Sequence, residues 1–266
     1  MTLQLASNLS EDPGEKSSPL EKTFAVLEFV AERGGATAKE ISDALGYPMP
    51  SVYRLAKALV QTGYLVHLKD QRRFELGYKP HQLAVSLHRQ IGIPTQVKSV
   101  IADLHQRLSM AAYFAVYRGA DVVVAYVVDS PKHPRLTPLN FGFHEAAHAT
   151  AFGKIMLAGM NEPQRNQYLA VHKPKSLLEN TITDQAELST HLESVMIDGI
   201  AWEHEEFVAG KTCAAVGVHN GAGMVVGAVA VSADTAFMVG REREVEVALR
   251  DSANKVSKYF RTGLAR

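Results

Sequence analysis

Five consecutive residues of this chain have the spacing of a zinc hydrolase. The segment His144-Glu145-Ala146-Ala147-His148 fits the H-E-x-x-H pattern. In that pattern two histidines on one helical face bind zinc, and the glutamate acts on the metal-bound water. No third ligand is obvious, since four downstream histidines have no diagnostic spacing: His172, His191, His204 and His219. Strand geometry over residues 143–147 would place the two histidines on the same side but too far apart for one zinc ion. We keep a metal- or thiol-dependent hydrolase as the alternative function and assign no metal ligand.

The single cysteine, Cys213, invites a thiol chemistry with His148 or His204 as its base. It stands in the alternating apolar run CAAVGV, where a lone cysteine is more often a small buried hydrophobic residue. We therefore predict no catalytic residue and no cofactor. A single cysteine also rules out a disulfide within one chain and is compatible with a reducing compartment.

A different chemistry, DNA binding, is indicated by residues 36–76. Thr37 and Glu40 have the spacing of a capping box, which predicts a short helix at 38–45. Gly46 ends that helix, and Pro50 suits the first turn of the next one. Two short helices joined by a tight turn fit the major groove of DNA.

The second of these helices, predicted at 50–62, is amphipathic. Its apolar residues recur at helical spacing on one face: Val52, Leu55, Ala56, Leu59 and Val60. The opposite face carries polar and basic groups that we expect to lie nearest bases or phosphates. The predicted contacts around this helix are Thr37, Pro50, Ser51, Tyr53, Arg54 and Lys57.

The segment after this helix reads as two strands around a turn at 69–72, which together form a wing. Lys69, Arg72 and Arg73 stand near its tip, where we expect them to contact phosphate. Between Pro48 and Pro80 there are six basic and two acidic residues, although the whole chain has no net charge. Basic charge concentrated in one element favours DNA as the partner. A winged domain that binds protein is the alternative to this reading.

The totals describe an ordinary globular chain of 266 residues, long enough for about two domains. No apolar run is long enough to span a bilayer. The N-terminal segment has neither the basic start nor the apolar core of a secretory signal, so we expect a cytoplasmic protein without a membrane partner.

Four segments follow from the patterns along the chain. Residues 1–19 read as a disordered tail, 20–78 as the DNA-binding domain, 79–94 as a linker and 95–266 as a second domain. In the first domain we predict a helix over 20–34 whose inner stripe is Leu20, Phe24, Leu27 and Ala31. In the linker we predict a helix at 79–91. Its apolar stripe of Leu83, Leu87 and Ile91 is free to pair with a second subunit.

The second domain mixes helical and strand patterns without strict alternation. Helices are predicted at 97–109, 149–159, 162–170, 184–197 and 241–260. Strands are predicted on either side of a turn at 118–121, and at 213–219 and 224–232. This order predicts an α+β fold with an antiparallel sheet flanked by helices.

Several stretches in the right order resemble the IclR family of regulators. They are SVYRLAKALVQTGYL, HATAFGKIMLA followed by TITDQAEL, and GIAWEHEEFVAGKTCAAVGV followed by GAVAVS. The resemblance spans residues 20–259. It implies an N-terminal winged helix-turn-helix domain and a C-terminal GAF-like α/β effector domain. It also implies a homodimer, or a dimer of dimers, that binds a palindromic operator in double-stranded DNA and responds to a small organic acid or an aromatic metabolite.

The resemblance also implies where the effector binds. Residues that face the effector in the family map onto Glu203, Cys213 and Ser232, with Ala230 on the same strand as Ser232. The helix that begins after His148 lines the same pocket, and Thr150 and Ala151 are the candidates at its first turn. Free N–H groups there suit a ligand carboxylate.

Two departures from the family pattern limit what the resemblance implies. Met49-Pro50-Ser51 stands where the family commonly has Lys-Ser-Thr, so the operator preference does not carry over. Glu203 aligns with a position that is often Asp, and His204 with another acid. The longer carboxylate and the neighbouring imidazole favour a different ligand.

Overall fold

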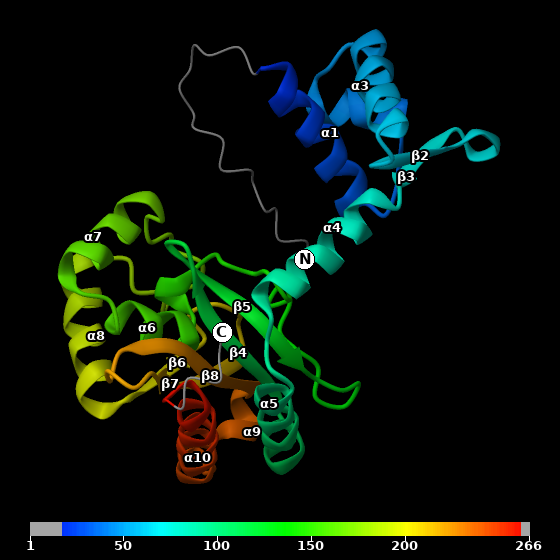
Figure 1. Cartoon of the computed structure of the whole chain (residues 1–266). Coiled ribbons are helices and arrows are strands. Elements are labelled where there is room, and N and C mark those ends of the chain that lie inside the picture. Colours follow the sequence, from blue (N-terminus) through cyan, green and yellow to red (C-terminus); the bar gives the residue numbers. More distant parts are fainter. Residues whose placement is uncertain (1–17, 262–266) are drawn as a thin grey trace. The chain divides into compact units, whose positions relative to one another are not determined.

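A computed structural model of the chain describes residues 18–261, which form two compact units with the boundary in the chain between Ile91 and Gly92 (Figure 1). Residues 1–17 of the predicted disordered tail lie outside the described part. The last two residues of that segment belong to the first helix, because Ser18 caps it and Pro19 begins it. The tail prediction is therefore wrong for Ser18 and Pro19.

The first unit, from residue 18 onward, consists of four main helices and a small sheet. Its elements are α1 (Pro19–Glu32), β1 (Ala36–Thr37), α2 (Ala38–Leu45), α3 (Met49–Gln61), β2 (Leu65–Leu68), the short 3-10 helix η1 (Lys69–Gln71), β3 (Arg73–Leu76) and α4 (Lys79–Ile91). Two capping boxes start α1 and α2: Ser18 with Glu21, and Thr37 with Glu40. Each box satisfies backbone N–H groups that have no partner within the helix.

The inner stripe predicted for α1 is wrong except at Leu27, which is partly buried and packs against the core. Val26 and Val30 are the buried residues of this helix, whereas Leu20, Phe24 and Ala31 are exposed. The helix carries apolar residues on more than one side, so its own periodicity does not select the buried face. Packing against α2, α3 and β3 does so instead.

The wing prediction is confirmed. β2 and β3 form an antiparallel hairpin around η1, with Leu65 opposite Leu76 and Leu68 opposite Arg73. The two-residue strand β1 adds to the other side of β3, in the order β1-β3-β2. Sequence patterns gave no sign of β1, because two residues are too few to show an alternation.

The second unit is an antiparallel sheet with helices on both faces. Its elements are α5 (Thr95–Leu108), β4 (Ala111–Arg118), β5 (Asp121–Val128), η2 (Ala147–Ala149), α6 (Ala151–Ala158), α7 (Glu162–Val171), α8 (Gln185–Asp198), β6 (Ile200–His204), β7 (Lys211–His219), β8 (Val225–Asp234), α9 (Thr235–Met238) and α10 (Glu242–Arg261). The strand order is β5-β4-β8-β7-β6, and every neighbouring pair is antiparallel. The predicted fold class is therefore confirmed.

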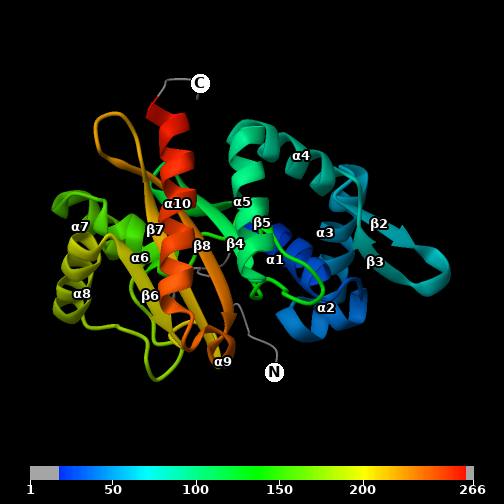
Figure 2. The ribbon, with the colours of Figure 1, turned by 90° about the horizontal axis from the view of Figure 1, so that it is seen from below.

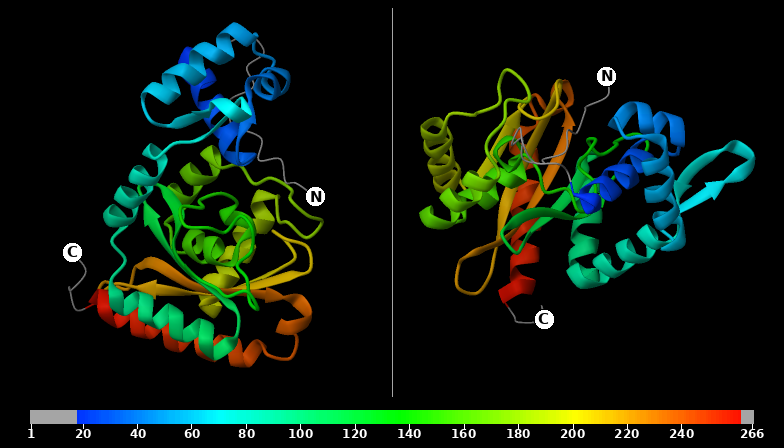
Figure 3. Two further views of the ribbon diagram at one scale, coloured as in Figure 1. Left: turned by 90° about the vertical axis from the view of Figure 1, so that its right-hand side faces the viewer. Right: turned by 90° about the horizontal axis from the view of Figure 1, so that it is seen from above.

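The two faces of this sheet are covered by different helices. α5 and α10 lie side by side on one face, and α6 packs on the other with α8 beyond it (Figures 2 and 3). On the α6 face the strands present mostly small residues, among them Ala201, Cys213, Ala215, Ala228 and Ala230. Small side chains let α6 approach the sheet closely. Its first turn therefore lies against the strands that carry the predicted pocket residues.

The strand β6 was not predicted, although it holds Glu203. The long connection between β5 and α6 also carries no regular element before η2. Within residues 18–261 no helix has both the length and the apolar composition that a bilayer span requires.

Candidate functional site

The outer face of α3 carries the residues that were predicted to reach DNA. Pro50, Tyr53, Arg54 and Lys57 are exposed, and Ser51 is half-buried. The inner face buries Val52, Leu55, Ala56 and Leu59, as the helical period predicted. The helix begins at Met49, one residue earlier than expected, with Pro50 in its first turn. The structure thus presents one aromatic and two cationic side chains together on an open helical surface.

The wing separates its three basic residues. Lys69 and Arg72 are exposed at the tip, where Arg72 adopts a left-handed backbone conformation with φ 52°. Arg73 instead turns back to the body of the unit. Its Nη2 donates to the Gly34 carbonyl oxygen (3.2 Å), and its Nε lies 3.4 Å from Glu75 Oε1. Arg73 is therefore held by its side chain against the body of the unit, whereas the side chains of Lys69 and Arg72 make no hydrogen bond or ion pair within residues 18–261.

Thr37 serves the start of α2. Its hydroxyl accepts from the Glu40 N–H (3.2 Å) and donates to Glu40 Oε2 (2.8 Å), while Glu40 Oε2 also accepts from the Thr37 N–H (2.7 Å). These bonds lower the pKa of Glu40, with the Thr37 backbone bond as the largest cause. The hydroxyl of Thr37 is engaged within the helix cap.

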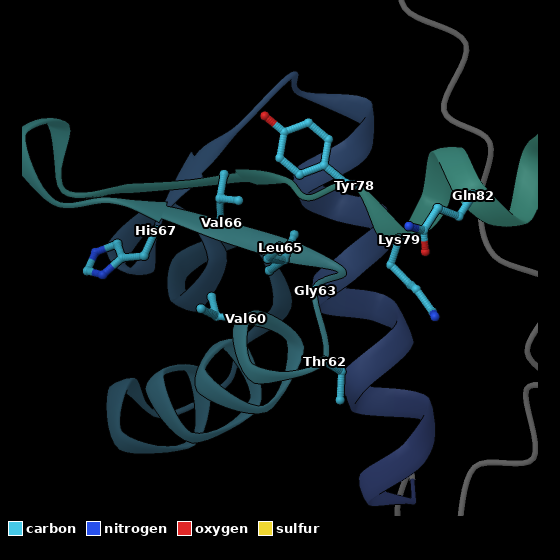
Figure 4. A pocket seen from close by; sticks show the side chains of 9 residues that line it. All are labelled: Val60, Thr62, Gly63, Leu65, Val66, His67, Tyr78, Lys79 and Gln82. Atoms are coloured by element: carbon cyan, nitrogen blue, oxygen red, sulfur yellow. The ribbon is translucent and has the colours of Figure 1, made fainter.

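A groove of about 490 Å³ lies elsewhere in the first unit, between the end of α3, β2 and the start of α4 (Figure 4). None of the predicted DNA contacts lines it. Its lining residues are Val60, Thr62, Gly63, Leu65, Val66, His67, Tyr78, Lys79 and Gln82.

In the second unit the sheet register brings three predicted pocket residues into one row. Glu203 of β6 is paired with Cys213 of β7, and Cys213 is paired with Ser232 of β8. All three are buried and share the face covered by α6. Ala230 lies on the same face two residues before Ser232. Tyr113 of β4 is paired with Ala230 and reaches Ser232 from the neighbouring row. Its hydroxyl is hydrogen-bonded to Ser232 Oγ (2.8 Å) and accepts from the Leu136 N–H (2.9 Å).

Glu203 is the central ionisable group of this row. Its exposure is 0%. Its Oε1 accepts from the backbone N–H groups of Glu206 (2.6 Å) and Phe207 (3.2 Å). Burial raises the pKa of Glu203, and contact with the Cys213 thiol and these two N–H groups offsets part of the rise. Burial likewise raises the pKa of Cys213, and the Glu203 charge adds to that rise. A thiol held in its neutral form is a poor nucleophile.

A buried ion pair lies beside this row. Lys154 of α6 has 0% exposure, and its ammonium is hydrogen-bonded to Glu206 Oε1. Neither Lys154 nor Glu206 was predicted as part of the site. The available signal was a lysine in the middle of the apolar segment AFGKIMLA, which is costly to bury unless it is paired.

The first turn of α6 lies over the same region. Thr150 stands at the N-cap of α6 with extended backbone, but its side chain makes no capping hydrogen bond. Its Oγ1 is buried and lacks a hydrogen-bond partner among residues 18–261. Ala151, the first residue of the helix, is fully buried. N–H groups at the start of this helix are therefore not satisfied by the cap side chain.

The connection between α7 and α8, residues 172–184, closes over this region and is called the strap here. The Thr181 hydroxyl donates to the Glu206 carbonyl oxygen (2.7 Å), and Asn180 Nδ2 donates to the His204 carbonyl oxygen (3.1 Å). His148 Nε2 lies 2.9 Å from the Lys175 carbonyl oxygen, and it donates a hydrogen bond to that oxygen in the tautomer that carries the proton on Nε2. Burial lowers the pKa of His148. His148, predicted as an effector-binding residue, thus also makes a structural contact with the strap.

The zinc-hydrolase alternative is wrong for this geometry. His144 is exposed in a loop, His148 is buried in the 3-10 helix η2, and Ala146 between them is left-handed with φ 51°. The two histidines therefore do not share an α-helical face. No group of three or more His, Cys, Asp or Glu in residues 18–261 is arranged to hold a metal ion.

Each of the two units matches a known domain family. Residues 19–69 match the family description of the IclR helix-turn-helix domain, and residues 85–258 match that of the C-terminal domain of bacterial IclR transcriptional regulators.

Individual proteins resemble the chain over most of its length. It is 27% identical to an HTH-type transcriptional regulator of Mycobacterium tuberculosis, over 86% of this chain and 87% of that protein. It is 26% identical to the HTH-type transcriptional regulator KdgR of Escherichia coli, over 94% of this chain and 95% of that protein. An IclR homologue of Microbacterium hydrocarbonoxydans, solved in complex with 4-hydroxybenzoate, has the same fold. It matches with a TM-score of 0.71 and 21% identity, covering 91% of this chain and 98% of that one.

Proposed function

Because the chain belongs to the IclR family of bacterial transcriptional regulators, we propose that it binds a palindromic operator as a homodimer or a dimer of dimers. In this proposal a small organic acid or an aromatic metabolite binds the second unit and changes operator occupancy. The proposed place of action is the cytoplasm.

The observation that carries the DNA-binding proposal is the outer face of α3. Tyr53, Arg54 and Lys57 are exposed on α3, the second helix of the α2–α3 pair within the matched segment. In such domains this helix enters the major groove, where arginine can pair with guanine and lysine can contact phosphate. Lys69 and Arg72 at the wing tip would then contact the flanking backbone.

The effector proposal rests on the buried row of the second unit. Glu203, Cys213 and Ser232 form one row on the sheet, and the first turn of α6 at Thr150 and Ala151 covers that side. Backbone N–H groups at a helix start favour an anion such as a carboxylate. The 4-hydroxybenzoate in the structure of the M. hydrocarbonoxydans homologue is an example of such a ligand. Binding to one of two conformations would shift operator affinity through a coupling of about 1–3 kcal/mol.

The test is a titration of the protein against the DNA upstream of its own gene, at several salt concentrations, beside a scrambled fragment. We expect preferential binding to the native fragment that weakens steeply with salt, because phosphate contacts release counterions. Arg54→Ala should reduce that preference. Equal binding of wild type and Arg54→Ala to both fragments would contradict the groove assignment.

A further inference from the structure

We propose that the start of α3 recognises the 5-methyl group of thymine through the side chains of Met49 and Tyr53. The inference rests on the proposed DNA binding and deepens it, because it names a base feature that this helix reads. Each operator half-site would then contain a thymine, facing the start of α3, whose methyl group contributes to affinity.

Met49 and Tyr53 form an exposed apolar surface at the start of α3. Met49 is 37% exposed and Tyr53 is 52% exposed, although both side chains are large and largely apolar. The two residues are four positions apart, so their side chains lie on the same side of the helix. Arg54 follows Tyr53 directly and Lys57 lies one turn further along, so this apolar surface is continuous with the cationic surface proposed to contact DNA.

The same part of the chain offers few groups for polar recognition of a base. Residues 46–53 have the sequence GYPMPSVY, which contains no charged residue, no asparagine and no glutamine. The side chains that pair with guanine or adenine through two hydrogen bonds are therefore absent here. Arg54 and Lys57 are the only charged residues of α3, and Ser51 is half-buried. Bases beside the first turn of α3 would thus meet mainly apolar atoms.

The backbone at the start of α3 also has few free donors. Pro48 and Pro50 have no N–H group. The N–H groups of Ser51 and Val52 both donate to the Pro48 carbonyl oxygen, at 2.8 and 3.1 Å. At most one N–H group in residues 48–52, that of Met49, is left to contact DNA. A helix start with several free N–H groups is suited to phosphate, whereas contact at the start of α3 depends on side chains.

The 5-methyl group of thymine is the apolar feature of the major groove. In helix-turn-helix domains the N-terminal residues of the second helix contact base edges. Methionine is flexible and adapts to the shape of a small apolar group, and an aromatic ring adds a broad apolar surface. Covering a methyl group with these side chains removes apolar area from water, which favours thymine over a base without the methyl group.

The experiment begins with selection of binding sequences from random double-stranded DNA by the full chain. Each thymine of the selected half-site is then replaced in turn by deoxyuridine, which lacks only the methyl group. We expect one replacement to weaken binding by about threefold to fivefold, the effect of burying one methyl group. Fluorescence anisotropy at one fixed salt concentration gives the affinities, because phosphate contacts change with salt. This series uses the wild-type protein and depends on no variant.

Variants then assign the effect to the two side chains. Met49→Ala/Tyr53→Ala should bind the thymine and deoxyuridine forms with equal affinity. Tyr53→Phe keeps the aromatic ring and should keep the full difference. Tyr78→Ala, at an exposed tyrosine outside α3, is the matched control and should also keep the difference. Thermal melting checks that each variant is folded.

Two results would overturn the inference. One is a half-site in which no deoxyuridine replacement weakens binding, and the other is an effect that persists unchanged in Met49→Ala/Tyr53→Ala. In both cases the protein would still bind a selected sequence, so the proposed DNA binding would stand. A selection that enriches no sequence would contradict the proposed DNA binding and this inference together.

Discussion

At the residue scale, Lys154 and Glu206 form the most deeply buried ion pair among residues 18–261. Both side chains are buried, so each charge depends on the other for its compensation. Glu203 lies close enough to Glu206 for the Glu206 charge to raise the pKa of Glu203. Loss of the lysine would therefore leave two carboxyl groups in one poorly solvated region.

Replacing Lys154 by Met should lower the free energy of unfolding by about 3–5 kcal/mol, the typical cost of leaving one member of a buried pair uncompensated. Trp202 is the single tryptophan and neighbours Glu203 in β6, so its fluorescence during urea denaturation reports on this sheet. Lys132→Met, at an exposed position, should change stability by less than about 0.5 kcal/mol. The double variant Lys154→Met/Glu206→Leu should recover most of the loss. A single variant as stable as wild type would show that the pair does not compensate a buried charge.

His148 gives the second unit a pH-dependent contribution to stability. Burial lowers the pKa of His148 in the folded state, and repulsion from Lys154 adds to this, while the bond to the Lys175 carbonyl partly offsets it. The unfolded chain therefore binds more protons than the folded chain just below the ordinary histidine pKa of about 6.5. The contribution is complete above that pH and is lost as the pH falls toward the lower pKa of the folded state.

Glutamine at position 148 can still donate to the Lys175 carbonyl but does not titrate. Between about pH 7.5 and pH 5.5, on either side of the ordinary histidine pKa, we therefore expect the wild-type protein to lose more stability than His148→Gln. The measurement is urea denaturation of both proteins at each pH. Glu203, whose pKa is raised by burial, contributes with the opposite sign between its ordinary pKa and its raised pKa. It is present in both proteins, so the comparison removes its effect. Parallel losses in the two proteins would assign the pH dependence to other groups.

At the scale of elements, the wing should separate DNA contact from domain stability. Arg72 is exposed at the tip, whereas Arg73 is bound to the Gly34 carbonyl and lies beside Glu75. Arg72→Ala should weaken binding about equally to all DNA sequences and reduce the salt slope by about 1, with unchanged thermal stability. Arg73→Ala should lower the melting temperature of the first unit and leave the salt slope nearly unchanged. Fluorescence anisotropy with labelled DNA over a series of salt concentrations gives both slopes. A reduced salt slope in Arg73→Ala together with reduced thermal stability in Arg72→Ala would contradict the proposed roles of the two residues.

Elements with strong local signals were predictable from the sequence. The α2–α3 pair, the wing and α4 have capping residues, turn residues or a clear apolar period, and α4 is observed at the predicted residues 79–91. α1 was predicted as a helix, but the wrong side was assigned to the core, since Leu20 and Phe24 are as apolar as Val26 and Val30. Only the neighbouring elements distinguish the two sides.

The pocket region was predictable in part. The row of Glu203, Cys213 and Ser232 was placed by resemblance, and the register of β6, β7 and β8 brings these residues together. Lys154, Glu206 and Thr181 were missed because their partners are 25 to 52 residues away in sequence. Local patterns carry no signal for such pairs. Their importance follows from burial, which appears only after the sheet and α6 have packed.

At the scale of the whole molecule, a chain without net charge concentrates basic residues in one segment, residues 48–80 of the first unit, which has six basic and two acidic residues. One helix and one wing contact only a short stretch of DNA, and a palindromic operator offers two such stretches. Joining two reading units in one assembly raises affinity because the second contact becomes intramolecular, typically by a factor of about 10²–10⁴. The proposed function therefore depends on a contact between two copies of the chain.

The apolar stripe of α4 is the predicted contact. Within residues 18–261 α4 buries none of its own residues, and Leu83 is 49% exposed while Leu87 and Ile91 are half-buried. Leu83→Glu/Leu87→Glu should shift the mass measured by light scattering from two or four times 29.0 kDa toward 29.0 kDa. Operator affinity should fall by about 100-fold or more, whereas affinity for an isolated half-site should hardly change. His81→Glu, at another exposed position of α4, is the control and should preserve both assembly and affinity. An assembly that survives the double substitution would place the contact elsewhere. A monomer that still binds the full operator tightly would mean that one copy is sufficient to recognise the DNA.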